Sequence, residues 1–402
     1  MLVLMVGQPR VDGMITLIAY STDSASSLKS CESAFYGAMR VALDVGPVRS
    51  QPAGVGTYVA NLAREIAQAS GLEVALMGRR EDADLDASLA GLPQSMLRPG
   101  HHHPWLQLHA DADARRLDAD LVHYTNAAAP MFGRAPFVLT VHDLSVMRMP
   151  QTHPFARWLT VPIALAAIAR AVGIIVPSRW TARELGRLGV SRDRIHVIEH
   201  ALTVDPGDSA SKTDVIKRLG LTDRAFVLYV GTLEPRKNLV RLIGAFEELA
   251  ADDAELKLVL AGAPGWRYEP IADRIAGSTV HDRILLPGYL SRADVATLLG
   301  GCTAFCYPSL YEGYGMPVLD AMAAGAPVVT SRTTSLPQAA GGAAILVDPL
   351  SERDIAQGLR RAVAERDRLV AAGRERVASR TWADVAREHV EVYAWALSRL
   401  RG

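Results

Sequence analysis

The segment YEGYGMPVLDAMAAG, residues 311–325, places two carboxylates eight positions apart with two glycines between them. Proline is favoured at the start of a helix and glycine just after its end, so Pro317 and Gly325 predict a helix between them. Free amides at the start of such a helix can bind an anion. The segment therefore contributes these candidate ligand-binding residues: Glu312, Gly313, Tyr314, Gly315, Met316, Val318 and Asp320.

The two carboxylates of this segment are not equally informative. Glu312 comes just before the predicted amides, where a sugar attached to a bound phosphate would lie, so we interpret it as a ligand contact. Asp320 has two interpretations. It could meet a ribose, or it could be an acid that the dipole of the helix favours in its first turn. The sequence leaves both open.

A second candidate is the pair of cations in YVGTLEPRKNL, residues 229–239. Arg236 and Lys237 follow a predicted strand, and open α/β sheets bind their ligands at the carboxyl ends of strands. Arginine and lysine side by side suit a diphosphate, one as a planar fork and the other as a point charge. The alternative is a solvated basic loop, but the position favours the diphosphate.

Two further stretches follow strands of the first half. In QPAGVGTYVANLAREIA, residues 51–67, Gly54 and Gly56 would let backbone approach a ligand, although a tight turn without a ligand explains them equally well. In FVLTVHDLSV, His142 and Asp143 directly follow a strand, so His142 is a site candidate beside the commoner structural role. The run at 101–103 has no further ligands at metal-binding spacing and is interpreted as a surface loop.

Short apolar runs alternate with helical patterns from Met39 onward, which indicates an α/β fold. Near-continuous Val, Ile and Leu runs are typical of parallel sheets covered on both faces. The polar stretch DPGDSASKTD separates two such series, so we expect two tandem Rossmann-like doubly wound domains facing across a cleft. The predicted strands are 40–45, 73–77, 121–124, 137–141, 173–176, 195–198, 226–231, 257–262, 284–288, 304–309, 326–331 and 343–348.

The domain boundaries follow from these patterns. Residues 1–38 are rich in serine and lack periodicity, and we expect a poorly ordered extension. The first domain is 39–205 and the second is 206–380. An amphipathic helix, 381–402, could pack back on the first domain.

Composition excludes some functions. The 43 basic and 43 acidic residues balance, so nothing suggests nucleic-acid binding, and three cysteines without a framework favour a reducing, cytoplasmic compartment. The apolar stretch 159–178 is long enough to raise the question of a membrane span, but Arg170 and Gly173 interrupt it. We expect a buried helix followed by a buried strand, and peripheral attachment to the inner face of a membrane stays open.

Taken together, these stretches resemble the family 4 retaining glycosyltransferases, which have the GT-B fold. The resemblance covers about residues 39–400 and rests on motifs in family order. These are GVGTYVANLAREIA, VHDLSV, VPSRWTARELGRLGV, YVGTLEPRKNL, PGYLSRADVATLL and YEGYGMPVLDAMAAGAPVVTS.

The resemblance implies that the first domain, 39–205, binds the acceptor and that the second, 206–380, binds the nucleotide sugar. It also implies roles for matching residues. His142 and Glu312 would contact the donor sugar, and Arg236 and Lys237 would bind its diphosphate; these four are the candidate catalytic residues. Asp320 matches, one methylene shorter, the family's ribose-binding glutamate. The glycine-rich first loop of the family, near the donor diphosphate and the acceptor, matches residues 54–56, and Thr232 stands where some members have an arginine.

The resemblance also implies the chemistry. We expect a metal-independent front-face transfer with retention, in which the leaving diphosphate accepts the acceptor proton; no cofactor is implied. The motif GTLEPRKNL resembles that of bacterial mannosyltransferases using GDP-mannose in surface polysaccharide or lipopolysaccharide assembly. Rhamnose or glucose donors, an epimerase or sugar-phosphate synthase of the same fold, and a non-catalytic nucleotide-sugar binder are the alternatives.

Overall fold

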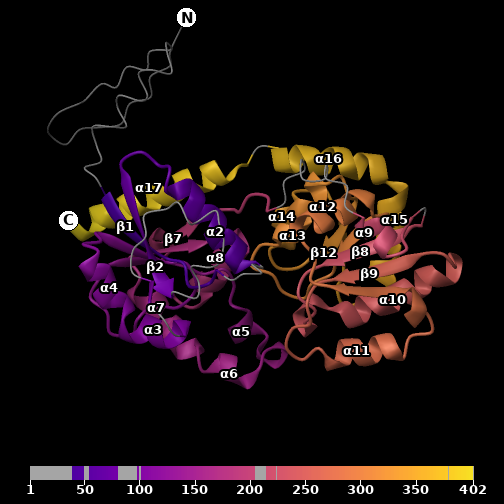
Figure 1. Cartoon of the computed structure of the whole chain (residues 1–402), viewed down its shortest axis with the longest axis horizontal. Helices are drawn as coiled ribbons and strands as arrows, with labels where there is room; N and C mark the ends of the chain where they lie inside the picture. Colours follow the sequence, from indigo (N-terminus) through magenta and orange to yellow (C-terminus); the bar gives the residue numbers. More distant parts are fainter. Residues whose placement is uncertain are drawn as a thin grey trace, which may run out of the picture. The chain divides into compact units, whose positions relative to one another are not determined.

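The computed structural model describes residues 39–48, 54–79, 97–98, 101–203, 214–222, 224–378 and 380–401. The expected N-terminal extension and most of the expected linker between the domains lie outside these residues. From Met39 onward the chain forms one compact unit, with two parallel sheets that confirm the predicted α/β fold (Figure 1).

The first sheet has the strand order β3-β2-β1-β4-β5-β6-β7, with every neighbouring pair parallel. Six strands match those predicted to within two residues, and only the two-residue β3 has no counterpart. Its strands are β1 (Met39–Asp44), β2 (Leu72–Arg79), β3 (Leu97–Arg98), β4 (Leu121–Tyr124), β5 (Phe137–Thr140), β6 (Gly173–Val176) and β7 (Ile195–Val197).

Helices cover both faces of this sheet. Helix α2 packs with the last helix of the chain on one face, and α3, α4, α7 and α8 share an apolar core on the other. The helices are α2 (Val55–Ile66), α3 (His102–Leu108), α4 (Ala110–Arg116), α5 (Ser145–Arg148), α6 (Phe155–Trp158), α7 (Val161–Arg170) and α8 (Arg179–Arg187), with 3₁₀ turns η2 (Pro150–Thr152) and η3 (Arg192–Arg194).

The second sheet has the order β10-β9-β8-β11-β12-β13, again parallel. Its strands are β8 (Phe226–Val230), β9 (Lys257–Ala261), β10 (Ile284–Gly288), β11 (Ala304–Tyr307), β12 (Val328–Ser331) and β13 (Ile345–Val347). Its helices are α9 (Val215–Arg218), α10 (Leu239–Asp252), α11 (Glu269–Ala276), α12 (Arg292–Gly301), α13 (Met316–Ala323), α14 (Leu336–Ala340), α15 (Glu352–Ala364) and α16 (Arg366–Ala378), with 3₁₀ turns η5 (Pro235–Lys237) and η6 (His281–Arg283).

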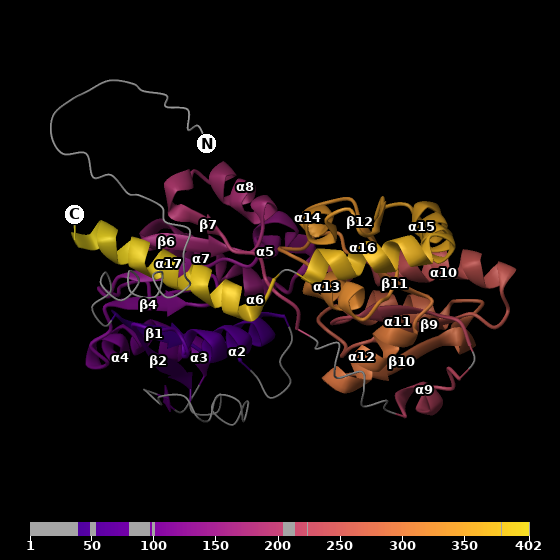
Figure 2. The same ribbon diagram turned by 90° about the horizontal axis from the view of Figure 1, so that it is seen from above.

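The last helix, α17 (Trp382–Arg401), lies against the first domain (Figures 1 and 2). Its buried His389 donates through Nδ1 to the carbonyl of Val385, 2.6 Å away, so Nε2 accepts from the hydroxyl of Tyr58 on α2 at 2.8 Å. Further hydrogen bonds join Tyr58 to Thr140 and Thr140 to His123. These neutral hydrogen bonds fix the last helix on the first sheet.

Two local expectations were wrong. The histidine run at 101–103 is not a loop, because α3 begins at His102 and buries Trp105 and Leu106 at helical spacing. The stretch 159–178 does contain a helix and a strand, and β6 is buried as expected. However, α7 is not a buried helix, because only Ala167 and Ile168 of its ten residues are buried. None of the helices in the described ranges has the length and apolar character that crossing a membrane requires.

Candidate active site

Charged side chains of the second domain gather where β8 and β11, neighbours in the sheet, end. Arg236 donates to the carboxylate of Glu234 (2.7 Å) and the carbonyl of Tyr311 (2.6 Å), and it lies 3.0 Å from the carboxylate of Glu312. Lys237 donates to Glu312 and to the hydroxyl of Tyr307, both at 2.6 Å. Glu234, Arg236, Lys237 and Glu312 form a charge-balanced group that we call the ion cluster.

The ion cluster is buried, so its members set one another's protonation. Burial alone would raise the pKa of Glu312, but Arg236 and Lys237 outweigh it and lower the pKa to about 2. Burial together with Arg236 lowers the pKa of Lys237, against the opposing pull of Glu312. Burial also opposes the charge of Arg236, yet Glu312 and other carboxylates raise its pKa well above the usual value. Glu312 is therefore a very weak base held in place by two cations.

One donor of the ion cluster remains unused. The Nε atom of Arg236 is buried, and no atom of the described residues accepts a hydrogen bond from it. A buried N–H without a partner is costly, so such groups usually serve a ligand or a strained function. The Nε atom of Arg236 is therefore a candidate donor to an anion, while the other two nitrogens bond Glu234 and Glu312.

His142 follows β5 in the first domain, and Nε2 lies 2.9 Å from the carbonyl of Thr125. A carbonyl only accepts, so Nε2 carries the proton and Nδ1 is the acceptor. Burial lowers the pKa of His142 to about 4, against the opposing effects of Thr125 and Asp143. His142 is therefore a neutral imidazole near pH 7. The loop of the second domain contacts it closely, because a Cβ on Gly313 would lie 1.8 Å from the His142 carbonyl oxygen.

The glycines adopt different roles. Gly54 (φ +54°) and Gly315 (φ +110°) are the residues that precede α2 and α13, and both have backbone that favours glycine. Gly56 was expected in the turn, but it is buried inside α2. Met316 starts α13. The expected free amide of Val318 was wrong, because Val318 is buried and its N–H donates to the Gly315 carbonyl at 3.0 Å.

Tyr314 was expected to contact the donor, but its hydroxyl faces the first domain. It donates to the carboxylate of Glu199 at 3.0 Å. Gln338 on α14 and Arg376 on α16 donate to the same carboxylate, at 2.7 and 3.0 Å. The Tyr314 side chain therefore joins the two domains. Of the predicted contact between Tyr314 and the sugar donor, only a contact through the backbone is left.

Asp320 does not lie in the first turn of its helix, because α13 begins at Met316 and has no acid in that turn. The explanation by the helix dipole is therefore wrong. The backbone amide of Thr203 donates to the Asp320 carboxylate at 2.7 Å, and the Thr203 hydroxyl donates to its other oxygen. Asp320 thus accepts two hydrogen bonds from Thr203, the last described residue before the linker.

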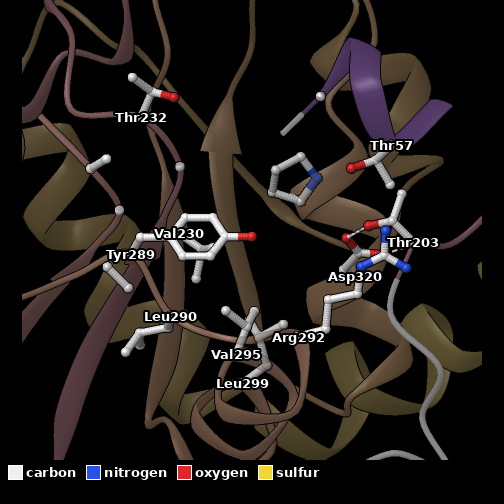
Figure 3. Close-up of a pocket in the computed structure, with 16 residues that line it drawn as sticks. Thr57, Thr203, Val230, Thr232, Tyr289, Leu290, Arg292, Val295, Leu299 and Asp320 are labelled. Atoms are coloured by element: carbon white, nitrogen blue, oxygen red, sulfur yellow. Dashed lines mark hydrogen bonds between the residues drawn. The ribbon is translucent and has the colours of Figure 1, made fainter. Parts of the chain in front are cut away.

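A pocket of about 270 Å³ opens at the carboxyl ends of β8, β9 and β10 (Figure 3). Of the predicted site residues it includes Gly54 and Asp320, whereas His142, Arg236, Lys237 and Glu312 do not line it. The pocket and the ion cluster are adjacent along the chain, since the loop after β8 and the segment 312–320 contribute to both. Its remaining lining residues are Thr57, Thr203, Val230, Gly231, Thr232, Ala261, Gly262, Ala263, Tyr289, Leu290, Arg292, Val295, Leu299 and Pro317.

Sequence reasoning missed most of these lining residues. The signal for Tyr289, Leu290 and Arg292 was available, because YLSR directly follows a predicted strand. Thr203 gave no signal, since its place depends on how the domains meet. In the described parts of the chain, no group of three or more His, Cys, Asp or Glu side chains is arranged to hold a metal ion.

Two family models match the chain, one to each domain. Residues 52–205 match the model described as Glycosyltransferase Family 4, and residues 211–376 match the one described as Glycosyl transferases group 1. Together they cover most of the two sheets and both sides of the pocket.

Curated relatives are similar over part or most of their length. O-antigen chain mannosyltransferase B of Escherichia coli is 34% identical over 217 residues, which are 53% of this chain and 57% of that one. The MMP alpha-(1->4)-mannosyltransferase of Mycolicibacterium hassiacum is 29% identical over 71% of this chain and 73% of that one. The first match thus spans little more than half of either protein.

Among solved structures, sucrose-phosphate synthase from Thermosynechococcus elongatus superposes with a TM-score of 0.73 at 20% identity. The superposition covers 90% of this chain and all of that one, so both domains have the same fold. With a family model on each half and this fold throughout, the chain belongs to the family 4 glycosyltransferases of the GT-B fold.

Proposed function

We propose that the protein transfers a hexosyl group from a nucleotide-diphosphate sugar to a polysaccharide or lipid-linked glycan. The observation that carries the proposal is the unused N–H of Arg236 in a buried ion cluster that shares two chain segments with the pocket. A nucleotide in the pocket would place its diphosphate toward that cluster. The charge of Arg236 and Lys237 would then stabilise the leaving diphosphate.

The pocket suits the nucleoside. Tyr289 and Leu290 offer apolar surface for a base, and the Asp320 carboxylate lines the same cavity (Figure 3). A ribose diol would donate to Asp320 in place of, or beside, the two donors of Thr203. The shorter side chain of aspartate, compared with the glutamate of the family pattern, would bring the ribose close to α13.

The ion cluster favours front-face substitution over a covalent intermediate. A carboxylate whose pKa is about 2 is a poor base, so Glu312 is better suited to accept hydrogen bonds from sugar hydroxyls. We propose that the acceptor oxygen bonds to the anomeric carbon on the face from which the diphosphate leaves. The proton of the acceptor passes to a phosphate oxygen, and configuration is retained. This route assigns no proton transfer to a metal.

His142 would position the donor sugar. With its proton on Nε2, its Nδ1 can accept from a sugar hydroxyl, and its low pKa keeps it neutral in the working range. It would not take the proton of the acceptor in this scheme, because that proton goes to the phosphate. Its contribution is the orientation of the hexose against Gly313 and Glu312.

Mannose from GDP-mannose is the proposed donor. Its support is that two curated relatives are named mannosyltransferases, one of them for an O-antigen chain. The acceptor would then belong to surface polysaccharide assembly, and we propose that the protein works peripherally at the inner face of the membrane. Rhamnosyl and glucosyl donors are the alternatives that the test distinguishes from mannose.

The test measures thermal stabilisation by GDP, UDP, dTDP and ADP, because a ligand that binds only the folded protein raises its midpoint of unfolding. We expect GDP to give the largest shift, and GDP-mannose to be consumed only when a glycan acceptor is present. Consumption without an acceptor would support an epimerase or hydrolase instead. No stabilisation by any of the four nucleotides would contradict the proposal.

A further inference from the structure

Helix α7 exposes apolar side chains where a surface helix ordinarily exposes polar ones. Pro162, Leu165 and Ala169 are exposed, and Trp158 before them continues the same spacing of three to four residues. A helix that is apolar on its outer as well as its inner side is usually covered on both. Ten residues are too few to cross a bilayer, so the cover must be a surface on which α7 lies.

Neighbouring residues extend this apolar stripe at both ends. Phe155, just before α7, is 72% exposed, and Phe132 in the loop after β4 is 95% exposed. Arg170 at the end of α7 donates to the carbonyls of Pro130 and Gly133, so it ties the Phe132 loop to the helix. In Figure 1, α6 and α7 lie on the side of the first sheet opposite to α17. We call Phe132, Phe155, Trp158, Leu159 and Leu165 the apolar face.

Arginines outnumber acids along the chain that forms the apolar face. The stretch 144–183 contains five arginines and no aspartate or glutamate, although Arg148 among them pairs with Glu184 just beyond it. Arg157 and Arg170, within or beside α6 and α7, are exposed. The nearest acid beside the Phe132 loop, Asp111, already accepts from the backbone amides of Arg134 and Ala135. Exposed apolar residues flanked by arginines, with the neighbouring acid already paired, suit an anionic lipid surface.

We propose that the apolar face docks onto an anionic lipid bilayer. Phe132, Phe155 and Leu165 would lie at the boundary between headgroups and acyl chains, and Arg157 would lie among the phosphates. The docking rests on the proposed function, since it gives the lipid-linked acceptor a place beside the first domain. It does not involve the ion cluster or the pocket.

The experiment is flotation of the full chain with vesicles of phosphatidylcholine alone or mixed with phosphatidylglycerol. We expect binding to the mixed vesicles that weakens as salt is added. Phe132→Ser, Leu159→Gln and Leu165→Gln together should lower the partition coefficient at least about tenfold. The matched control combines Leu350→Gln and Val363→Gln, exposed apolar residues of the second domain, and should bind like the wild type.

Three results would overturn the proposal. They are no binding of the wild type to mixed vesicles, equal binding to both kinds, and undiminished binding of the triple variant. Sedimentation velocity tests a second copy as the alternative occupant, and a dimer that the triple variant abolishes would also count against lipid docking. Stabilisation by GDP is measured on the same samples. It should be unchanged in the triple variant, so failure of the nucleotide assignment is seen separately.

Discussion

The ion cluster and the contacts between the domains hold the segment 312–320 by different means. Inside the second domain, Glu312 is fixed by two buried cations. Between the domains, Asp320 accepts from the amide and hydroxyl of Thr203, and on the first domain Tyr58 donates to the neutral His389 of α17. A buried ion pair is costly to break from one side, whereas neutral donors can be exchanged for those of a ligand. The difference suggests that the ion cluster, the proposed diphosphate site, is rigid, whereas the contact between the domains can open.

Removal of the Glu312 charge should have the largest effect. In Glu312→Gln, Arg236 and Lys237 become neighbouring buried cations with one carboxylate fewer, which should cost about 3–5 kcal/mol of unfolding free energy. Transfer activity should fall at least about 100-fold, since the sugar contact and the cluster geometry are lost together. Urea unfolding and a donor-consumption assay measure the two effects.

The control for this variant is another ion pair of similar length. Glu248 lies 2.7 Å from Arg360, but both side chains are largely solvated. Glu248→Gln should therefore change stability by less than about 1 kcal/mol. Equal losses of stability in Glu312→Gln and Glu248→Gln would show that burial does not make the ion cluster more important for stability than a surface ion pair.

The cations themselves should affect the diphosphate more than the nucleoside. Lys237→Met or Arg236→Gln should weaken GDP binding by about 2 kcal/mol, which is about 30-fold. Binding of guanosine, which lacks phosphates, should change little, because neither side chain lines the pocket. Calorimetry with both ligands measures the difference, and Arg332→Gln, in a surface pair with Asp348, is the control. An equal loss of affinity for guanosine would contradict the assignment of these two cations to the diphosphate.

The sequence predicted the strands and the place of the cluster for one physical reason. Buried parallel strands are continuous apolar runs, and the ends of neighbouring strands meet at one edge. Arg236 after β8 and Glu312 after β11 could therefore be expected together. The ion pair between Arg236 and Glu312 could not be expected. The pattern of residue types does not say whether a cation faces a ligand or an acid.

Contacts between the domains were beyond prediction for a different reason. Tyr314 reaches Glu199, and Asp320 reaches Thr203, across more than a hundred residues of sequence. Such pairs depend on how two separately folded cores meet, and no periodicity within one segment records it. The contact of the Tyr314 hydroxyl with Glu199 could therefore not be predicted.

Acid should loosen the neutral contacts while leaving Glu312 charged. Burial lowers the pKa of His389 from its usual 6.5 to about 4, so the unfolded chain binds this proton more readily. Stability from His389 is present above pH 6.5 and is lost as the pH falls toward 4, by about 2 kcal/mol between pH 7 and pH 5. Glu312, with a pKa of about 2, adds no change in this range.

Urea unfolding at pH 7 and pH 5 measures this loss. His389→Gln can still accept from Tyr58 through its side-chain oxygen, and it should show a smaller difference between the two pH values. The buried His123 and His142 also have lowered pKa values, so part of the wild-type pH dependence should remain in this variant. A wild-type stability that is the same at both pH values would show that these histidines do not hold α17 in the neutral form.

The smallest expected effect tests the exchange of donors at Asp320. Thr203→Val removes the hydroxyl bond and keeps both the backbone amide and the volume of the side chain. The variant should lose about 1 kcal/mol of stability without ligand. If a ribose replaces Thr203 as the donor to Asp320, the variant should bind GDP as tightly as the wild type, or more tightly, because less must be displaced. Calorimetry decides: weaker GDP binding would mean that Thr203 and the nucleotide act together on the carboxylate, and that this contact is as fixed as the ion cluster.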